Sequence, residues 1–403
     1  MKKFIFTIVA IFISIFLFLA IGEIMFRIFR GAPNPLAHFS QKNETFLSEA
    51  NQIRTSYVAG DDGVKYKVHN NQYGYRGKNF NHPKDEGKTR IFLIGDSFTF
   101  GVGCEDHQTI PAMVEKLLLE KGFDVEVINA GMHHTSPITH YRNLKNIHMQ
   151  YEPDMVVLLF DMTDLRDDWQ KQRNAVYDEE GNITHFDATI VDGKKDWWLV
   201  LVTKSAFAKW THNKIVRAFK KLKILGLKNY TKISQEGKRA KGEIAILEGI
   251  TDENVIVEYD GMLMMRGPER RALINKQWNR ITAKHISKMH NLLKDKKIPF
   301  FIAMYPYGIH VDETQWNEGR KVWGFEQGKV YTDYYPFELV KGYAKTKGIP
   351  YINSLENFLK APKKKYFFDF DGHLTVEGNE IVAQTIVNNL EFSEALLSLE
   401  KEK

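Results

Sequence analysis

A serine stands at the end of an apolar run in the segment FLIGDSFTFG, residues 92–101. A serine hydroxyl in such a place can act as a nucleophile when a histidine takes its proton and an acid orients that histidine. It can equally be an ordinary cap of a following helix, because serine is a preferred N-cap residue. The segment alone leaves both interpretations of Ser97 open, so the rest of the chain must supply the partners.

The C-terminal part of the chain contains both partners that such a serine needs. In the stretch YFFDFDGHLTVEGNEI, Asp371 and His373 stand directly before a segment with helical periodicity. At a spacing of two residues the carboxylate meets the imidazole only if the chain turns between them, and Gly372 makes that turn easy. A plain turn followed by a helix cap is the alternative interpretation.

The acids of this stretch also suggest a calcium loop, but the pattern fails. Such a loop needs an oxygen ligand at its fifth position and a glycine at its sixth, where this chain has His373 and Leu374. We therefore expect no metal, and we expect no cofactor.

Composition and charge are typical of a globular protein. The chain has 403 residues, of which 43% are hydrophobic and 26% charged, and its net charge is +6. This charge is mild for the size, and nucleic-acid-binding proteins usually gather more of it on one face, so we expect no nucleic-acid partner. A single cysteine, Cys104, excludes an intramolecular disulfide.

The N-terminus predicts a membrane anchor. Residues 4–21 (FIFTIVAIFISIFLFLAI) carry no charge, and roughly 20 apolar residues in a helix span a bilayer. The run is longer than the apolar core of a typical signal peptide and no clear cleavage site follows it. We interpret residues 1–25 as an uncleaved transmembrane helix, with a cleaved signal as the alternative. Basic residues lie on both sides of the run, so charge does not set its orientation.

The body of the chain alternates short apolar runs with segments of helical periodicity. The runs with strand character lie at residues 90–95, 124–131, 153–164, 298–306 and 349–354. Strands separated by single helices imply an α/β fold with a doubly wound parallel sheet. We expect a flavodoxin-like sheet of about five strands with helices on both faces.

The alternation of apolar runs and helical segments, and the long stretch in which it is absent, predict six parts of the chain. They are the anchor (1–25), a stalk and lead-in (26–85), the first part of the core (86–168), a basic and mostly helical insertion (169–267), the second part of the core (268–395) and a charged tail (396–403).

The insertion has an unusual charge distribution. Residues 204–241 contain twelve lysines or arginines and one acid, Glu236. A solvated helix face with a packed apolar side explains this pattern. A helix that lies on an anionic membrane surface or binds an acidic polymer explains it as well.

The order of these blocks resembles the SGNH (GDSL-type) hydrolase superfamily. The carrying motifs are GDSFTFG after the first strand, INAG after the second, and D-x-H followed by L-x-x-x-G near the end, spread over about residues 70–165 and 296–395. The lead-in NQYGYRG behind a membrane anchor is similar to bacterial, envelope-facing members, some of them linked to polysaccharide O-acylation.

The resemblance implies roles for individual residues. Ser97 would be the nucleophile, His373 its base and Asp371 the residue that orients the base. The backbone N–H groups of Ser97 and Gly131 would donate to the oxyanion. The family's third donor, an asparagine, falls on Thr163, whose hydroxyl donates one hydrogen bond from a shorter side chain.

The stretch that contains Asp371 and His373 departs from the family pattern as well. The commoner motif is D-x-x-H, and Phe370 occupies its Asp position here, so Asp369 is a fallback partner for the histidine. Two further places could contact a substrate. His133 and His134 follow the second strand, and Tyr305 and Tyr307 end the fourth.

The resemblance then implies a function and a location. We expect a serine esterase or O-acyltransferase that acts on acyl esters, taken as acetyl, of an acylated envelope carbohydrate or similar substrate. It would be a single-pass membrane protein with an extracytoplasmic catalytic domain. The alternative is a catalytically weakened binding or scaffolding subunit of a glycan-modifying complex, beside an integral membrane acyltransferase.

Overall fold

The computed structural model describes residues 47–58, 61, 63–179, 181–187, 190, 191, 193–197, 200, 205, 207 and 252–401, with residues 6, 14, 17, 20–25 and 28 of the N-terminus. The chain forms two compact units. One takes residues 1–44 and 173–231, and the other takes residues 45–172 and 232–403. The second unit holds the central sheet and every candidate site residue.

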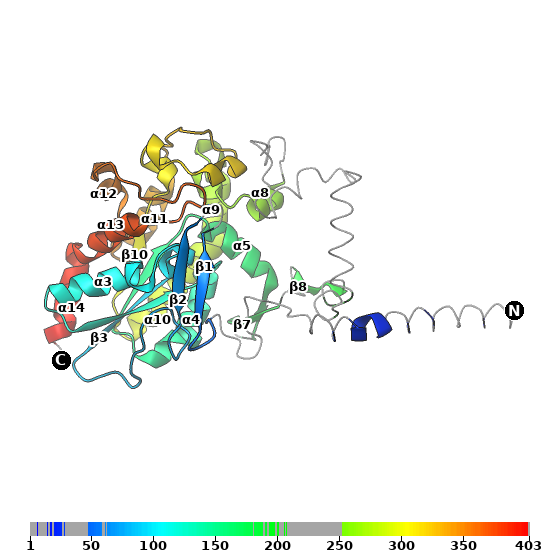
Figure 1. Ribbon diagram of the computed structural model, residues 1–403, viewed down its shortest axis with the longest axis horizontal. Coiled ribbons are helices and arrows are strands. Elements are labelled where there is room, and N and C mark those ends of the chain that lie inside the picture. Colours follow the sequence, from blue (N-terminus) through cyan, green and yellow to red (C-terminus); the bar gives the residue numbers. More distant parts are fainter. Residues whose placement is uncertain are drawn as a thin grey trace. The chain divides into compact units, whose positions relative to one another are not determined.

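A parallel sheet of five strands forms the centre of the second unit (Figure 1). Its strands are β3 (Thr89–Gly95), β4 (Val125–Gly131), β5 (Met155–Phe160), β10 (Phe300–Met304) and β11 (Tyr351–Asn353). They lie in the order β11-β10-β5-β3-β4, and all four neighbouring pairs are parallel. This is the predicted five-stranded, doubly wound sheet with flavodoxin-like strand order.

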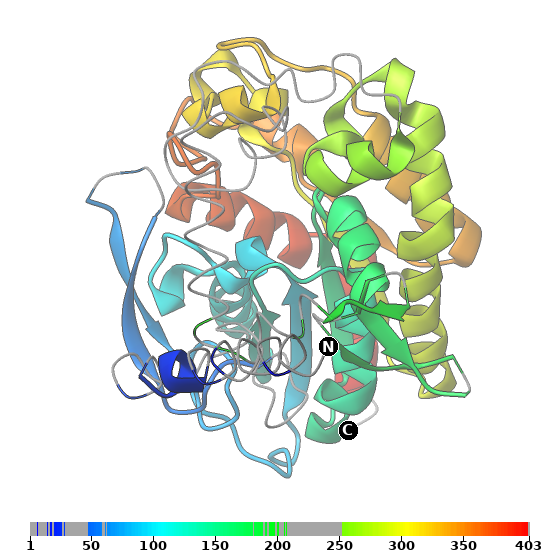
Figure 2. The same ribbon diagram turned by 90° about the vertical axis from the view of Figure 1, so that its right-hand side faces the viewer.

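Helices cover both faces of the sheet (Figure 2). The helices that pack on it or on one another are α3 (Ile110–Glu120), α4 (Pro137–Asn146), α10 (Ala283–Asp295), α11 (Tyr335–Lys347) and α13 (Val376–Val387). Helix α3 packs beside α13, and α4 packs beside α10. Every residue of β3, β4, β5 and β10 is buried, as expected for strands covered on both sides.

Further helices and strands surround this core. In the second unit they are β1 (Ile53–Tyr57), β2 (Lys65–His69), α2 (Ser97–Phe100), α5 (Asp164–Asn174), α8 (Glu253–Tyr259), α9 (Arg271–Gln277), α12 (Leu355–Lys360) and α14 (Leu390–Lys401). Strands β1 and β2 form an antiparallel hairpin within the predicted lead-in. Helix α14 extends into the predicted charged tail, because its Phe392 and Leu396 are fully buried.

The described part of the predicted insertion contains both helices and strands, and its helical parts are the end of α5, helix α8 and the 3-10 helix Leu263–Met265. It contains two short antiparallel pairs, β6 (Ala175–Tyr177) with β7 (Ile183–Phe186) and β8 (Ile190–Val191) with β9 (Lys194–Lys195). Nearly all of the basic stretch lies outside the described residues, so its helical character stays a prediction.

The predicted membrane anchor also lies mostly outside the described residues. Within the part of the chain that the structure describes, no helix is long and apolar enough to cross a membrane.

A substitution at Gly131 tests how closely the end of β4 packs against α2, the short helix that begins at Ser97. A Cβ atom at this position would lie 2.2 Å from the backbone N of Phe100 and 2.5 Å from the carbonyl carbon of Thr99. Backbone atoms of a short helix yield little, so we expect Gly131→Ala to lower the free energy of unfolding by about 1–3 kcal/mol. Urea denaturation of both proteins measures this loss.

A matched control is Gly342→Ala in α11, where an added Cβ meets no atom within 4 Å. Alanine is a better helix former than glycine, so this variant should be as stable as the parent or slightly more stable. Equal stability of the two variants would contradict the account of Gly131.

Candidate active site

The end of β3 presents Ser97 at the first position of α2. Asp96 caps this helix, since its carboxylate accepts the backbone N–H of Phe98 at 2.9 Å. The helix spans four residues and ends at Gly101, whose φ of +91° is left-handed. The capping role therefore belongs to the aspartate, and the hydroxyl of Ser97 lies 3.3 Å from Oδ2 of Asp96 and has a second, closer partner.

That partner is His373, which approaches from the loop before α13. Its Nε2 lies 2.8 Å from the Oγ of Ser97, and its Nδ1 makes a short hydrogen bond to Oδ1 of Asp371. Gly372 lies between acid and base with a left-handed φ of +85°, which lets the chain turn back within two residues. The structure thus brings Ser97, His373 and Asp371 into one line of hydrogen bonds, the arrangement that activates a serine.

The lead-in supports the loop that carries this acid and base. The carboxylate of Asp61 accepts the backbone N–H of Phe370 at 2.9 Å and that of Asp371 at 2.8 Å. Asp369 takes no part, because it pairs with Lys365 at 2.5 Å and its side chain is 78% exposed. The fallback partner for the histidine is therefore excluded in this structure.

The electrostatics of the pair favour a proton on the histidine. Burial acts to lower the pKa of His373, but the adjacent Asp371 and the nearby Asp96 outweigh it, and the pKa lies above its ordinary value. Burial acts to raise the pKa of Asp371, and the contact with His373 outweighs it, so this pKa is lowered. The carboxylate is therefore charged when the histidine is, and it stabilises the imidazolium that forms when Ser97 loses its proton.

A buried carboxylate, Asp161, lies behind the site at the end of β5. It accepts the hydroxyl groups of Tyr307 at 2.8 Å and Tyr305 at 3.2 Å. It also accepts the backbone N–H of Thr163 at 2.7 Å and, in a short hydrogen bond, the hydroxyl of Thr163. Burial and this neighbouring carboxylate raise the pKa of Asp96 well above its ordinary value.

These contacts decide which oxyanion donors are available. The backbone N–H of Ser97 makes no hydrogen bond to any described residue. The N–H of Gly131 donates to Oδ1 of Asn129 at 3.0 Å, and the hydroxyl of Thr163 donates to Asp161. Of the three predicted donors, therefore, Ser97 has a free group, and the other two would have to give up a partner.

The two residues predicted to contact a substrate, Tyr305 and His133, differ in burial. Tyr305 is 1% exposed and its ring lies 4.9 Å from that of Phe98, so it supports the site from inside rather than facing a substrate. His133 is partly buried with its ring 4.4 Å from that of Phe100. Burial, with a contribution from His373, lowers the pKa of His133 to about 3, so this side chain is neutral.

Several residues of the site gave no signal in the sequence. Asp61, Asp161 and Arg320 stand in segments without a motif, and each is brought to the site by the tertiary fold. Only Asp161, an acid within the predicted strand run 153–164, had a position that could have indicated it.

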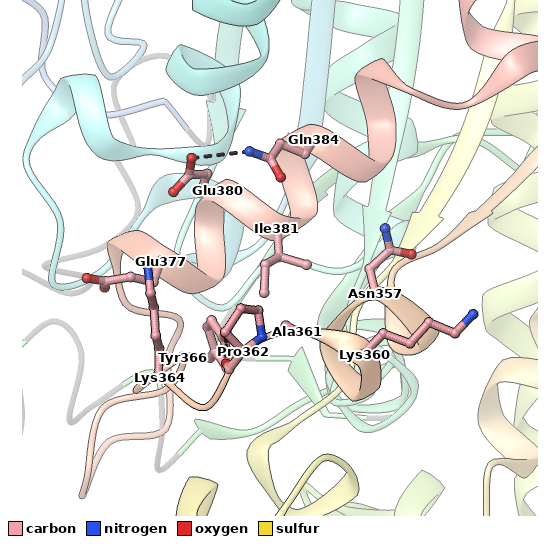
Figure 3. Close-up of a pocket in the computed structure, with 10 residues that line it drawn as sticks. All are labelled: Asn357, Lys360, Ala361, Pro362, Lys364, Tyr366, Glu377, Glu380, Ile381 and Gln384. Carbon is pink, nitrogen blue, oxygen red and sulfur yellow. Dashed lines mark hydrogen bonds between the residues drawn. The ribbon is translucent and has the colours of Figure 1, made fainter.

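A hollow lies between α12 and α13 (Figure 3). It measures about 500 Å³, and the lysines and glutamates on its wall, Lys360, Lys364, Glu377 and Glu380, give it no single sign of charge. None of Ser97, His373 and Asp371 lines it. Within the described ranges no three histidine, cysteine or acidic side chains are placed to hold a metal ion.

Comparison with known proteins gives matches among solved structures. No protein-family model and no curated protein matches the chain. A family 3 carbohydrate esterase from Clostridium thermocellum is 10% identical over 78% of this chain and 99% of its own, with a TM-score of 0.36. An acetyl xylan esterase is 13% identical over 73% and 96%, with a TM-score of 0.35. A GDSL-like lipase from Bacteroides thetaiotaomicron is 12% identical over 77% and 89%, with a TM-score of 0.31.

These matched proteins are two esterases and a GDSL-like lipase. At these identities and TM-scores they carry no argument about what this chain does. The chemistry is therefore argued from the site itself.

The raised pKa of His373 predicts the pH dependence of activity. The histidine accepts the proton of Ser97 only when neutral, so kcat/KM should fall as the pH drops through a pKa above the ordinary 6.5. Asp371→Asn removes the largest contribution that raises this pKa. The acid limb should then move to lower pH, and the plateau should fall by a factor of about 10⁴, as for the matching change in a serine protease. An acid limb that stays in place would contradict this role of Asp371.

The Thr163 contacts predict a small effect of removing its hydroxyl. Thr163→Val keeps the shape and deletes a group that the structure directs at Asp161. We expect kcat to fall less than about tenfold, whereas loss of a true oxyanion donor costs about 10²–10³ in kcat. Steady-state kinetics on one ester, with Thr163→Ser as the control that keeps the hydroxyl, separates these outcomes.

Proposed function

We propose that this protein is an SGNH-type serine ester hydrolase or O-acyltransferase that works through an acyl-enzyme on Ser97. The observation that carries the proposal is the line of hydrogen bonds from Ser97 through His373 to Asp371. A serine with an ordinary capping role needs neither a histidine at 2.8 Å nor an acid behind that histidine.

The reaction follows from the geometry. As the Oγ of Ser97 attacks the ester carbonyl, Nε2 of His373 takes its proton, and the carboxylate of Asp371 stabilises the resulting imidazolium. The tetrahedral oxyanion accepts the free N–H of Ser97 at the start of α2, where the helix dipole also favours negative charge. The histidine then returns the proton to the leaving alcohol, and an ester bond to Ser97 remains.

A second nucleophile completes the cycle. Water attacking the acyl-enzyme gives hydrolysis, and a sugar hydroxyl gives acyl transfer, with His373 as base in both cases. The same residues serve both outcomes, so the outcome depends on which nucleophile reaches the acyl group.

The proposal extends to substrate and location. The substrate is an acylated carbohydrate of the cell envelope, and the apolar run 4–21 anchors the chain in a membrane with the catalytic unit outside the cytoplasm. The length of that run and the basic stretch 204–241 support this part.

A binding or scaffolding role is the second candidate. The observation that favours it is the engagement of the Thr163 hydroxyl and the Gly131 N–H by other residues. Such a protein would keep the fold and the segment around Ser97 but would not catalyse ester hydrolysis or acyl transfer.

Kinetics of three proteins test the proposal. The full-length protein in detergent should hydrolyse p-nitrophenyl acetate. Ser97→Ala and His373→Ala should each lower kcat/KM by about 10³-fold or more, since each removes a member of one catalytic unit. Retained turnover in either variant would contradict the catalytic roles of Ser97 and His373. Absence of turnover in all three, together with no labelling of Ser97 by a serine-reactive phosphonate, would favour the scaffolding role.

A further inference from the structure

Arg320 is a buried cation without a carboxylate partner. It lies in the 3-10 helix Glu318–Trp323 and is 6% exposed. Its Nη1 contacts Sδ of Met262 at 3.3 Å, and its guanidinium lies over the ring of Tyr307 at 4.4 Å. Its Nε is buried and has no hydrogen-bond partner. No ion pair joins Arg320 to any acid among the described residues.

Two other buried arginines of the described chain differ from Arg320. The side chains of Arg76 and Arg90 are fully buried, and each meets a carboxylate at 2.7 Å, from Asp106 and Glu126 respectively. Burying a charge is costly unless it is paired, so an unpaired guanidinium is retained against a free-energy cost. This contrast indicates that the partner of Arg320 lies outside the described residues.

The position of Arg320 says where that partner would sit. A Cβ atom placed on Gly372 would lie 2.8 Å from Nη2 of Arg320 and 3.1 Å from Oδ1 of Asn317. Gly372 stands between Asp371 and His373, so the guanidinium lies against the loop that carries the catalytic acid and base. A ligand group that reaches Arg320 is therefore close to the ester bond that Ser97 attacks.

Asn317 adds a second polar group at the same place. It is fully buried, and its Nδ2 donates to the carbonyl oxygen of Phe368 in a short hydrogen bond. This bond fixes the orientation of the amide, and its Oδ1 has no partner. The site thus offers a cation and one acceptor, which suits a carboxylate with a hydroxyl beside it.

We propose that Arg320 and Asn317 form a carboxylate-binding subsite, and that the substrate is an acyl ester bearing a carboxylate, as in an acylated sugar acid. The inference rests on the proposed function and names its substrate class. Arg320 pairs with the carboxylate, and Asn317 accepts a hydroxyl hydrogen of the same molecule. A role of Arg320 purely as an internal counter-charge to Asp371 is the opposing explanation.

Matched ester pairs test the subsite. One pair carries the charge on the alcohol side, 4-acetoxybenzoate against its methyl ester. The other carries it on the acyl side, mono-p-nitrophenyl succinate against p-nitrophenyl butyrate. For each pair, the ratio of kcat/KM for the anionic ester to that for the neutral ester is measured in the parent, Arg320→Met, Arg320→Lys and Lys321→Met.

We expect the ratio for one pair to fall at least tenfold in Arg320→Met and by less in Arg320→Lys, which keeps the charge but loses the planar fork. Lys321→Met removes a neighbouring, partly exposed cation that pairs with Glu318, and it should leave the ratio unchanged. Equal losses on the anionic and neutral esters in Arg320→Met, or ratios that do not change, would overturn the subsite.

A binding measurement separates this proposal from the activity. Calorimetric titration of Ser97→Ala with 4-hydroxybenzoate and with succinate should show binding of at least one of them. Adding Arg320→Met to the same protein should weaken it at least tenfold. Absence of binding to either, or equal binding in both proteins, would overturn the subsite even if ester hydrolysis is found. Binding without any ester turnover would support the subsite and reject the esterase.

Discussion

The hydrogen bond between Nε2 of His373 and Oγ of Ser97 joins two segments that lie 276 residues apart in the chain. The end of β3 and the loop before α13 place these two atoms within hydrogen-bond distance. The sheet places Ser97 at the carboxyl end of β3, next to β5, where the strand order changes direction. Open α/β sheets bind ligands at such a point, because the loops on either side diverge there.

The side chains that position Ser97 and His373 are mostly buried acidic groups. Asp371 holds the imidazole from behind, and Asp61 holds the loop through two backbone N–H groups. On the other side of the nucleophile, Asp161 gathers the hydroxyl groups of Tyr305 and Tyr307. Burial and Asp161 raise the pKa of Asp96, and the carboxyl groups of Asp371 and Asp96 raise the pKa of His373. A buried cation beside the same loop, Arg320, is the one charge of this set that lacks an opposite partner of its own among the described residues.

The sheet could be predicted from the sequence because parallel strands covered on both faces form continuous apolar runs, as in residues 90–95. The contact of Ser97 with His373 could be predicted as well. A serine nucleophile needs a histidine and an acid, and the sequence Asp371-Gly372-His373 supplies both. Asp61 and Arg320 could not be predicted, since segments without a local pattern place them through tertiary contacts, and Asp161 is marked only by its position in the predicted run 153–164. The sequence was also uninformative about Thr163, because only the structure shows that its hydroxyl is taken by Asp161.

The central claim is that the acyl group of the substrate passes through Ser97. The most direct measurement is mass spectrometry of the protein mixed with p-nitrophenyl acetate and quenched with acid within the first turnover. The account predicts one added acetyl group per chain, carried by the peptide that contains Ser97 and absent in Ser97→Ala. Ester turnover with no acetyl group on that peptide, or with the acetyl group on another residue, would contradict it.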